Sequence, residues 1–115
     1  MCYQFGPCPS PGPLFLRPTV IGGDALADDY SVIHDGRRIG RIRKATERQA
    51  KGVVWDWMIN IPLPIPPGCT GTAADLDAAK DAFHVAWAWF LPTLTAHDIQ
   101  HWHHHQDAAE HRRRP

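Results

Sequence analysis

The side chains with the clearest chemical potential form a basic stretch in the first half of the chain. Within residues 37–51, Glu47 is the single acid among arginines and lysines. Such residues on one surface would neutralise phosphates and release counterions, and arginine can also form two hydrogen bonds with guanine. The alternative is a solvated sheet face whose charges protect a strand edge. The candidate nucleic-acid-binding residues are Arg37, Arg38, Arg41, Arg43, Lys44, Arg48 and Lys51.

Histidines near the end of the chain form a second candidate group. His97, His101 and His105 would lie on one face of a helix, and imidazoles one turn apart can chelate zinc, nickel or copper. A closed metal site also needs a fourth ligand and supporting hydrogen bonds, which a polar, weakly packed helix does not supply. The alternative is a solvated helix that binds metal adventitiously, so we expect no cofactor.

Motifs for catalysis are missing from the sequence. It contains no nucleophile–base motif, no glycine-rich phosphate loop and no pair of carboxylates on a predicted rigid element. Gly22-Gly23 precedes an acidic loop rather than a helix, so it is not a dinucleotide-binding fingerprint. We therefore expect a binding module and not an enzyme.

Composition limits the class of protein. A chain of 115 residues suffices for one domain with one core. Twelve lysines and arginines balance twelve acidic residues, so any electrostatic attraction must be local. Three cysteines without C-x-x-C spacing argue against a disulfide framework, and the apolar runs suit neither a signal peptide nor a membrane span. We expect a cytoplasmic protein with no membrane partner.

Three parts are predicted along the chain. Residues 1–16 are rich in proline and glycine and are expected to lack regular structure. Residues 17–92 carry the pattern of a β-β-β-α domain. Residues 93–115 are expected to form a polar, histidine-rich helix over about residues 96–109, opened by a capping box at Thr95, and a basic tail.

The basic residues are predicted to lie on a β-hairpin. Two β-prone runs, residues 30–34 and 37–44, flank the turn signal Asp35-Gly36. Two registers remain open: Val32 opposite Ile39 across a two-residue turn, or Tyr30 opposite Ile42 across a three-residue loop. Strand alternation places Arg41 and Arg43 on one face and Arg38 on the other.

The next elements are predicted to build the core. Residues 53–61 alternate as a strand with Trp55 and Trp57 on its apolar face. Residues 62–72 are predicted to form a crossing loop, because four prolines between positions 62 and 67 exclude a central strand. A helix capped by Asp75 then presents Phe83. We expect Trp55, Trp57 and Phe83 to be buried together.

Aromatic residues crowd the end of that helix. Trp87 and Trp89 are separated by about 200° of helical rotation, so one of them should face outward, near Trp102. Either the second helix or a partner protein could cover this residue. Protein–protein interaction through the aromatic helix end and the proline loop is therefore the alternative function.

Several short motifs follow one another along the chain, namely Leu16-Arg17-Pro18-Thr19-Val20-Ile21-Gly22-Gly23, Asp28-Asp29-Tyr30, Gly40-Arg41-Ile42, Trp55-Asp56-Trp57, Gly71-Thr72-Ala73-Ala74-Asp75-Leu76-Asp77, Ala86-Trp87-Ala88 and Leu94-Thr95-x-x-Asp98-Ile99. In them the chain resembles a family of small uncharacterised proteins from rhizobia and related alphaproteobacteria, over about residues 16–100. The resemblance implies no activity, ligand or site residue. Pro67-Gly68-Cys69 followed by Leu76-x-x-Ala79 is also similar to antitoxin domains of the HicB type, with a shorter spacing between the two motifs.

Together these patterns predict an α+β fold in which a three-stranded antiparallel sheet packs on one helix, with a peripheral polar C-terminal helix and a disordered leader. The best specific hypothesis for function is nucleic-acid binding through the basic hairpin. The alternative is a protein–protein interaction module of the antitoxin-like or oligomerising kind. A single positive face on an uncovered sheet would favour the first.

Overall fold

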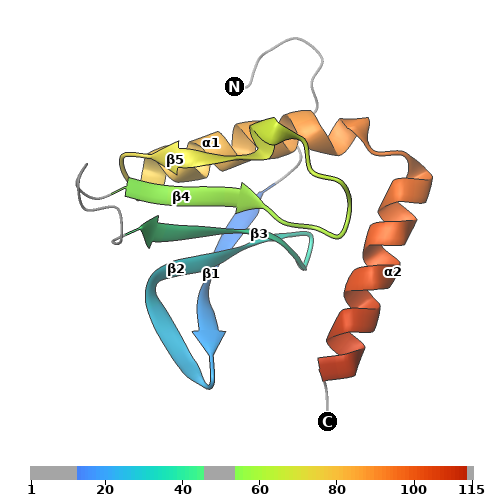
Figure 1. Ribbon diagram of the computed structural model, residues 1–115, viewed down its shortest axis with the longest axis horizontal. Helices are drawn as coiled ribbons and strands as arrows, with labels where there is room; N and C mark the ends of the chain where they lie inside the picture. Colours follow the sequence, from blue (N-terminus) through green and yellow to red (C-terminus); the bar gives the residue numbers. More distant parts are fainter. Residues whose placement is uncertain (1–12, 46–53, 114–115) are drawn as a thin grey trace.

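The computed structural model describes residues 13–45 and 54–113, which form an α+β fold. Within these residues a five-stranded antiparallel sheet has the order β1-β2-β3-β4-β5, and two α-helices follow it (Figure 1). The expected three-stranded sheet is therefore wrong, although the α+β class is confirmed. The elements are β1 (Leu14–Ile21), β2 (Asp24–His34), β3 (Arg37–Ala45), β4 (Val54–Ile59), β5 (Thr70–Ala73), α1 (Leu76–Phe90) and α2 (Ala96–Arg113), with short 3-10 turns η2 (Pro67–Cys69) and η3 (Leu91–Thr93).

Strand β1 begins inside the span that was expected to lack regular structure. It pairs with β2 across a tight turn at Gly22 and Gly23, whose φ angles of +62° and +89° lie in the left-handed region that favours glycine. A bulge interrupts the ladder between Pro18 and Val20. Because β1 is an edge strand, the missing N–H of Pro18 is tolerated there.

Strand β5 lies inside the segment that was expected to be a crossing loop. It pairs with β4, so that Gly71 faces Trp57 across the ladder. A Cβ atom at Gly71 would meet the Trp57 indole at 3.1 Å, which explains why a glycine lies there. The hydroxyl of Thr70 also donates a hydrogen bond of 3.0 Å to the Trp57 carbonyl. The prolines end before this strand begins, and the sheet gains its second edge.

The hairpin of β2 and β3 combines both registers that the sequence left open. Next to the turn, Ile33 pairs with Arg38, as a two-residue turn at Asp35-Gly36 requires. A bulge then shifts the register, and further along Tyr30 pairs with Ile42. The bulge inserts Ile39 as an extra residue in β3, which reverses the alternation of side chains between the two faces. Arg38 therefore lies on the same face as Arg41 and Arg43. The predicted opposition of Arg38 to these two arginines is therefore wrong.

Helix α1 packs across β3, β4 and β5 and covers one face of the sheet (Figure 1). The rings of Phe83 and Trp57 meet edge to face with centroids 6.2 Å apart, and Phe83 is fully buried. Trp55 is buried on the same face of the sheet. The expected core of Trp55, Trp57 and Phe83 is confirmed.

Helix α2 begins at the expected capping box. The Thr95 hydroxyl accepts from the Asp98 N–H at 3.0 Å, and the Asp98 carboxylate accepts from the Thr95 N–H at 2.9 Å. Helix α2 follows the end of α1 and lies to one side of the sheet (Figure 1). Its contact with the core is made by Trp102, which is buried edge-on against Trp87 with ring centroids 5.8 Å apart. Neither helix of the described residues is long and apolar enough to cross a membrane.

Candidate functional site

The basic stretch is divided between several surfaces. Arg38, Arg41 and Arg43 lie on the sheet face opposite α1, here called the open face. Arg37 points instead toward α2, where its guanidinium bonds the Asp107 carboxylate at 2.9 Å. Helix α2 borders the open face near the turn, because Gln106 donates to the Arg38 carbonyl at 2.7 Å. Arg48 and Lys51 lie outside the described residues.

Acidic residues from other segments accompany these cations. The Arg41 guanidinium forms a two-pronged bond with Asp29, whose Oδ1 accepts from Nε at 2.8 Å and also from the Thr19 hydroxyl at 2.8 Å. This arginine is the main cause that lowers the pKa of Asp29, and the carboxylate in turn raises the pKa of Arg41. Further pairs are Arg43 with Asp56 and Lys44 with Asp28, each at 3.7 Å. The charge run of the sequence is thus largely compensated in space.

The pair of Asp29 and Arg41 yields a prediction about stability. In a double-mutant cycle, Asp29→Asn and Arg41→Gln should show a coupling of about 1 kcal/mol, because the carboxylate is buried while the guanidinium is a third exposed and partly screened. The folded state lowers the pKa of Asp29, so this contribution is present above the ordinary value of 3.8 and is lost as the pH falls through the folded pKa. Urea unfolding of the four proteins at neutral and at acid pH measures both effects. Purely additive changes at neutral pH would contradict the pairing.

The histidines of α2 gather without forming a closed site. The rings of His101 and His105, one turn apart on the exposed side of the helix, contact each other at a tilt of 48° with centroids 4.2 Å apart. Among the described residues no group of three or more histidine, cysteine, aspartate or glutamate side chains is placed to hold a metal ion. The expectation that His97, His101 and His105 bind metal adventitiously stays a prediction.

Stoichiometric zinc should therefore leave the melting temperature almost unchanged. A specific site would stabilise the fold by about 2.7 kcal/mol at a hundredfold excess of ligand over Kd. Calorimetry with and without zinc measures this difference. A rise of that size that disappears in His101→Ala would show a specific site on α2.

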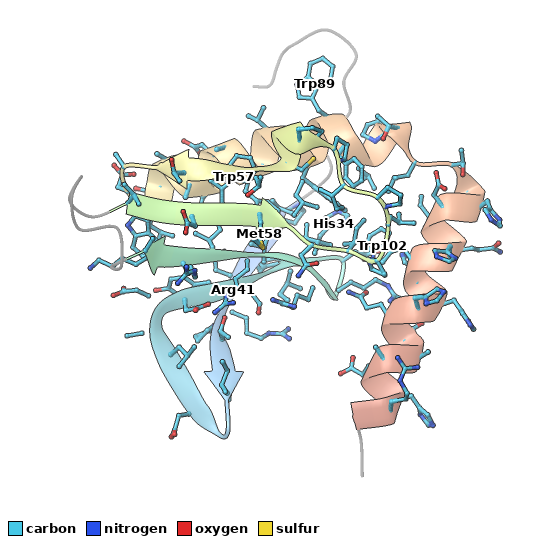
Figure 2. All side chains as sticks on the ribbon, in the orientation of Figure 1. His34, Arg41, Trp57, Met58, Trp89 and Trp102 are labelled. Atoms are coloured by element: carbon cyan, nitrogen blue, oxygen red, sulfur yellow. The ribbon has the colours of Figure 1, made fainter. Side chains whose placement is uncertain are left out.

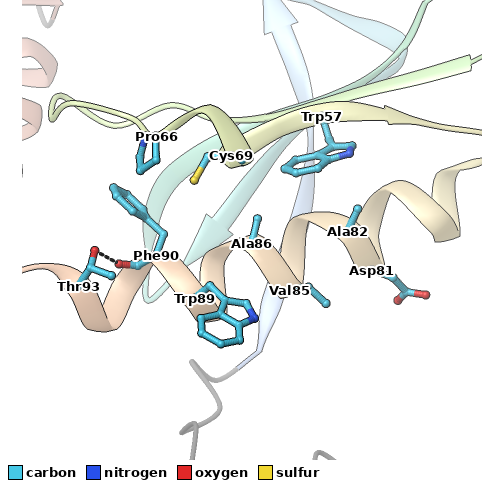
Figure 3. Close-up of a pocket in the computed structure, with 11 residues that line it drawn as sticks. Trp57, Pro66, Cys69, Asp81, Ala82, Val85, Ala86, Trp89, Phe90 and Thr93 are labelled. Atoms are coloured by element: carbon cyan, nitrogen blue, oxygen red, sulfur yellow. Dashed lines mark hydrogen bonds between the residues drawn. The ribbon is translucent and has the colours of Figure 1, made fainter. Parts of the chain in front are cut away.

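An apolar hollow lies between α1 and the turn η2 (Figure 3). It has a volume of about 640 Å³ and is called here the α1 groove. Trp89 is 68% exposed and Val85 is 54% exposed, and both belong to its helical wall. Its lining residues are Trp57, Pro66, Gly68, Cys69, Asp81, Ala82, Val85, Ala86, Trp89, Phe90 and Thr93.

Helix α1 forms this wall because it carries two apolar stripes. The first stripe, with Phe83 and Trp87, is buried against the sheet and α2. The second stripe lies beside the first and consists of residues spaced three or four apart, namely Ala82, Val85, Ala86 and Trp89. Figure 2 shows that Trp89 projects away from the sheet whereas Trp102 points toward the core. The second helix therefore covers Trp87 and leaves Trp89 open, which answers a question that the sequence left open.

The polar groups of the α1 groove suit binding better than catalysis. Burial raises the pKa of the Cys69 thiol, so it stays protonated and is a poor nucleophile. The Thr93 hydroxyl donates to the Phe90 carbonyl at 2.6 Å. Asp81 is the charged residue among the lining residues. The groove thus offers an apolar surface with few polar groups.

Two parts of this groove, the aromatic end of α1 and the proline loop, were predicted from the sequence as an interaction surface. The second stripe of α1 that connects them was missed. The signal was present, because Ala82, Val85, Ala86 and Trp89 recur at steps of three and four residues.

Comparison with known proteins adds no relative: no family model, no curated protein and no solved structure matches this chain. The resemblance to small rhizobial proteins and the likeness to antitoxin domains therefore stay predictions.

Proposed function

We propose that this protein is a non-catalytic interaction module that binds a short, extended and uncharged segment of a partner protein in the α1 groove. The observation that carries the proposal is the second apolar stripe of α1, whose Trp89 is 68% exposed and Val85 54% exposed at the rim of a concave surface. Exposed apolar surface of this kind is typical of interaction sites.

The lining of the groove favours a proline-containing ligand. Trp89 supplies the exposed aromatic surface, and the buried Trp57 and Phe90 lie beneath it in the lining. Grooves lined by aromatic residues are the usual receptors for segments in the polyproline conformation. Such a segment loses little entropy on binding, since proline already fixes its backbone. Asp81 disfavours acidic ligands, because like charges repel. An uncharged proline-rich segment fits all these properties.

Selection from displayed peptides with prolines at regular positions tests this proposal. Selected peptides should bind the wild-type protein, and Trp89→Ser should weaken them at least tenfold. Phe15→Ser is the matched control, because Phe15 is 60% exposed and lies on β1, away from the groove. Equal losses in the two variants, or no selected binder, would overturn the proposal.

Nucleic-acid binding by the open face is the second candidate. It is supported by the bulge in β3, which brings Arg38 to the same face as Arg41 and Arg43. The acidic partners Asp29 and Asp56 oppose it, because a phosphate must compete with them. Binding to mixed-sequence duplex DNA should then be detectable at about 50 mM salt, and each lost contact should flatten the salt slope by about one unit. Absence of binding at that salt concentration would exclude this candidate.

A further inference from the structure

We infer that a polar hollow between the open face and α2 binds a small zwitterionic ligand, which carries a carboxylate at one end and an ammonium group at the other. This hollow is called here the α2 hollow. Its volume of about 480 Å³ lies in the range of small-molecule sites. It is a separate site from the α1 groove, because the two share no lining residue.

One part of the α2 hollow is basic and belongs to the open face. Arg17 on β1 pairs with Ser31 on β2 across the ladder, and both line the hollow. The Arg38 guanidinium donates from Nε to the Ser31 hydroxyl oxygen at 3.1 Å, so the hydroxyl hydrogen can still donate to a ligand. Two guanidinium groups and a hydroxyl donor suit a carboxylate, since guanidinium groups form charge-assisted hydrogen bonds with it.

Another part of the lining is acidic. Asp35 lies at the turn between β2 and β3, and Asp107 and Glu110 lie three positions apart on α2. Arg37 neutralises Asp107 through a bond of 2.9 Å. The carboxylates of Asp35 and Glu110 then favour an ammonium group, and they repel a ligand that carries negative charge alone.

Two opposite charges of this hollow are available to a ligand. Within residues 13–45 and 54–113, the side chains of Arg17 and Glu110 form no hydrogen bond or ion pair, either with each other or with another residue. Both nevertheless line the same hollow. A ligand with a single charge would be attracted by one of these side chains and repelled by the other. A ligand with both charges can pair with each, so charge complementarity selects a zwitterion.

The α2 hollow is formed before a ligand enters. Gln106 on α2 donates to the Arg38 carbonyl at 2.7 Å and accepts from the Arg37 guanidinium at 3.1 Å, which holds the helix beside the hairpin. Ile33 also lines the hollow and offers apolar contact to the carbon chain of a ligand. Little ordering is therefore needed on binding. A ligand that contacts Arg17 and Glu110 would connect β1 with α2 and stabilise the docked position of the helix.

The test titrates the full-length protein with glycine, 4-aminobutyrate and 6-aminohexanoate, which carry the same two charges at increasing separation. We expect at least one of them to bind, and the carboxylate and the amine of equal chain length to bind at least tenfold more weakly. Arg17→Gln and Glu110→Gln should each weaken binding about tenfold. Lys80→Gln is the control, because it removes a positive charge on α1 outside the hollow. The bound zwitterion should also increase the hydrogen-exchange protection of α2.

Three results would overturn the inference. The first is equal affinity for a zwitterion and for the carboxylate or amine of the same length, which would show that a single charge is recognised. The second is an equal loss of binding in Arg17→Gln and Lys80→Gln, which would show an effect of net charge. The third is no binding of any zwitterion of the series at about 10 mM, where a ligand with a Kd of about 1 mM is detected. None of these results bears on the α1 groove, which has other lining residues.

Discussion

Phe83→Ala should lower the free energy of unfolding by about 3–5 kcal/mol, the usual cost of removing a fully buried phenylalanine side chain. Phe83 is 0% exposed and fills the space between α1 and the sheet, where its ring meets the edge of Trp57. A Cβ atom placed on Gly40 would come within 2.5 Å of the Phe83 ring, which shows how closely the strand backbone approaches it. The truncation therefore leaves a cavity that the glycine-lined strand cannot fill.

Chemical denaturation of the wild type and of Phe83→Ala measures this cost. Val85→Ala is the matched control on the same helix: its side chain is 54% exposed, so its effect should stay within about 0.5 kcal/mol. A Phe83→Ala protein as stable as the wild type would contradict the packing of α1 on the sheet.

Trp102→Ala should cost about 3 kcal/mol or more and should release α2 from the rest of the domain. Trp102 is 3% exposed and packs against Trp87, whereas the other contacts of α2 with the hairpin are polar and partly exposed. Once the indole is removed, α2 retains only the partly buried Ile99 and the bonds from Arg37 to Asp107 and from Gln106 to the Arg38 carbonyl among these contacts, and bonds of this exposed kind contribute little stability.

Hydrogen exchange separates the release of α2 from the loss of stability of the whole domain. In Trp102→Ala, amides of α2 should lose protection to a greater degree than amides of β3 and β4, since the sheet and α1 retain their own core. The control is His104→Ala, an exposed position two residues further along α2, which should change neither. Persistent protection of α2 without Trp102 would mean that Ile99 and the polar contacts suffice to dock it.

Local patterns foretold the central elements of this fold. The strict alternation around Trp55 and Trp57 identified β4, and the spacing of Ala79, Phe83 and Trp87 identified the buried stripe of α1. The capping box at Thr95 fixed the start of α2. In each case the residues that define the element are close in sequence and carry a periodic signal.

The two edge strands, β1 and β5, were not predicted because the prolines in and before them indicated irregular structure. β1 contains Pro18 and follows a proline-rich run, and β5 follows the prolines that end at Pro67. Proline excludes a central strand but not an edge strand, and both β1 and β5 lie at edges. A short strand such as Thr70–Ala73 is specified by its pairing with β4 rather than by its own sequence.

For the candidate sites too, residues close in sequence could be predicted, whereas contacts between distant segments could not. The basic run was visible in the sequence, but its partners Asp29, Asp56 and Asp107 come from other strands or from α2. The bulge that unites Arg38 with Arg41 depends on strand pairing and had no local sign. The α1 groove likewise requires η2 to be folded opposite the helix, so the second stripe alone could not distinguish a groove from additional core.

The most direct measurement of this account is an NMR titration of the wild-type protein with a selected proline-containing peptide. The account predicts that the largest shifts fall on Ala82, Val85, Ala86 and Trp89, and that Trp89→Ser abolishes them while Phe15→Ser does not. Shifts that map instead to Arg38, Arg41 and Met58 on the open face, or a titration that perturbs no residue of the α1 groove, would contradict it.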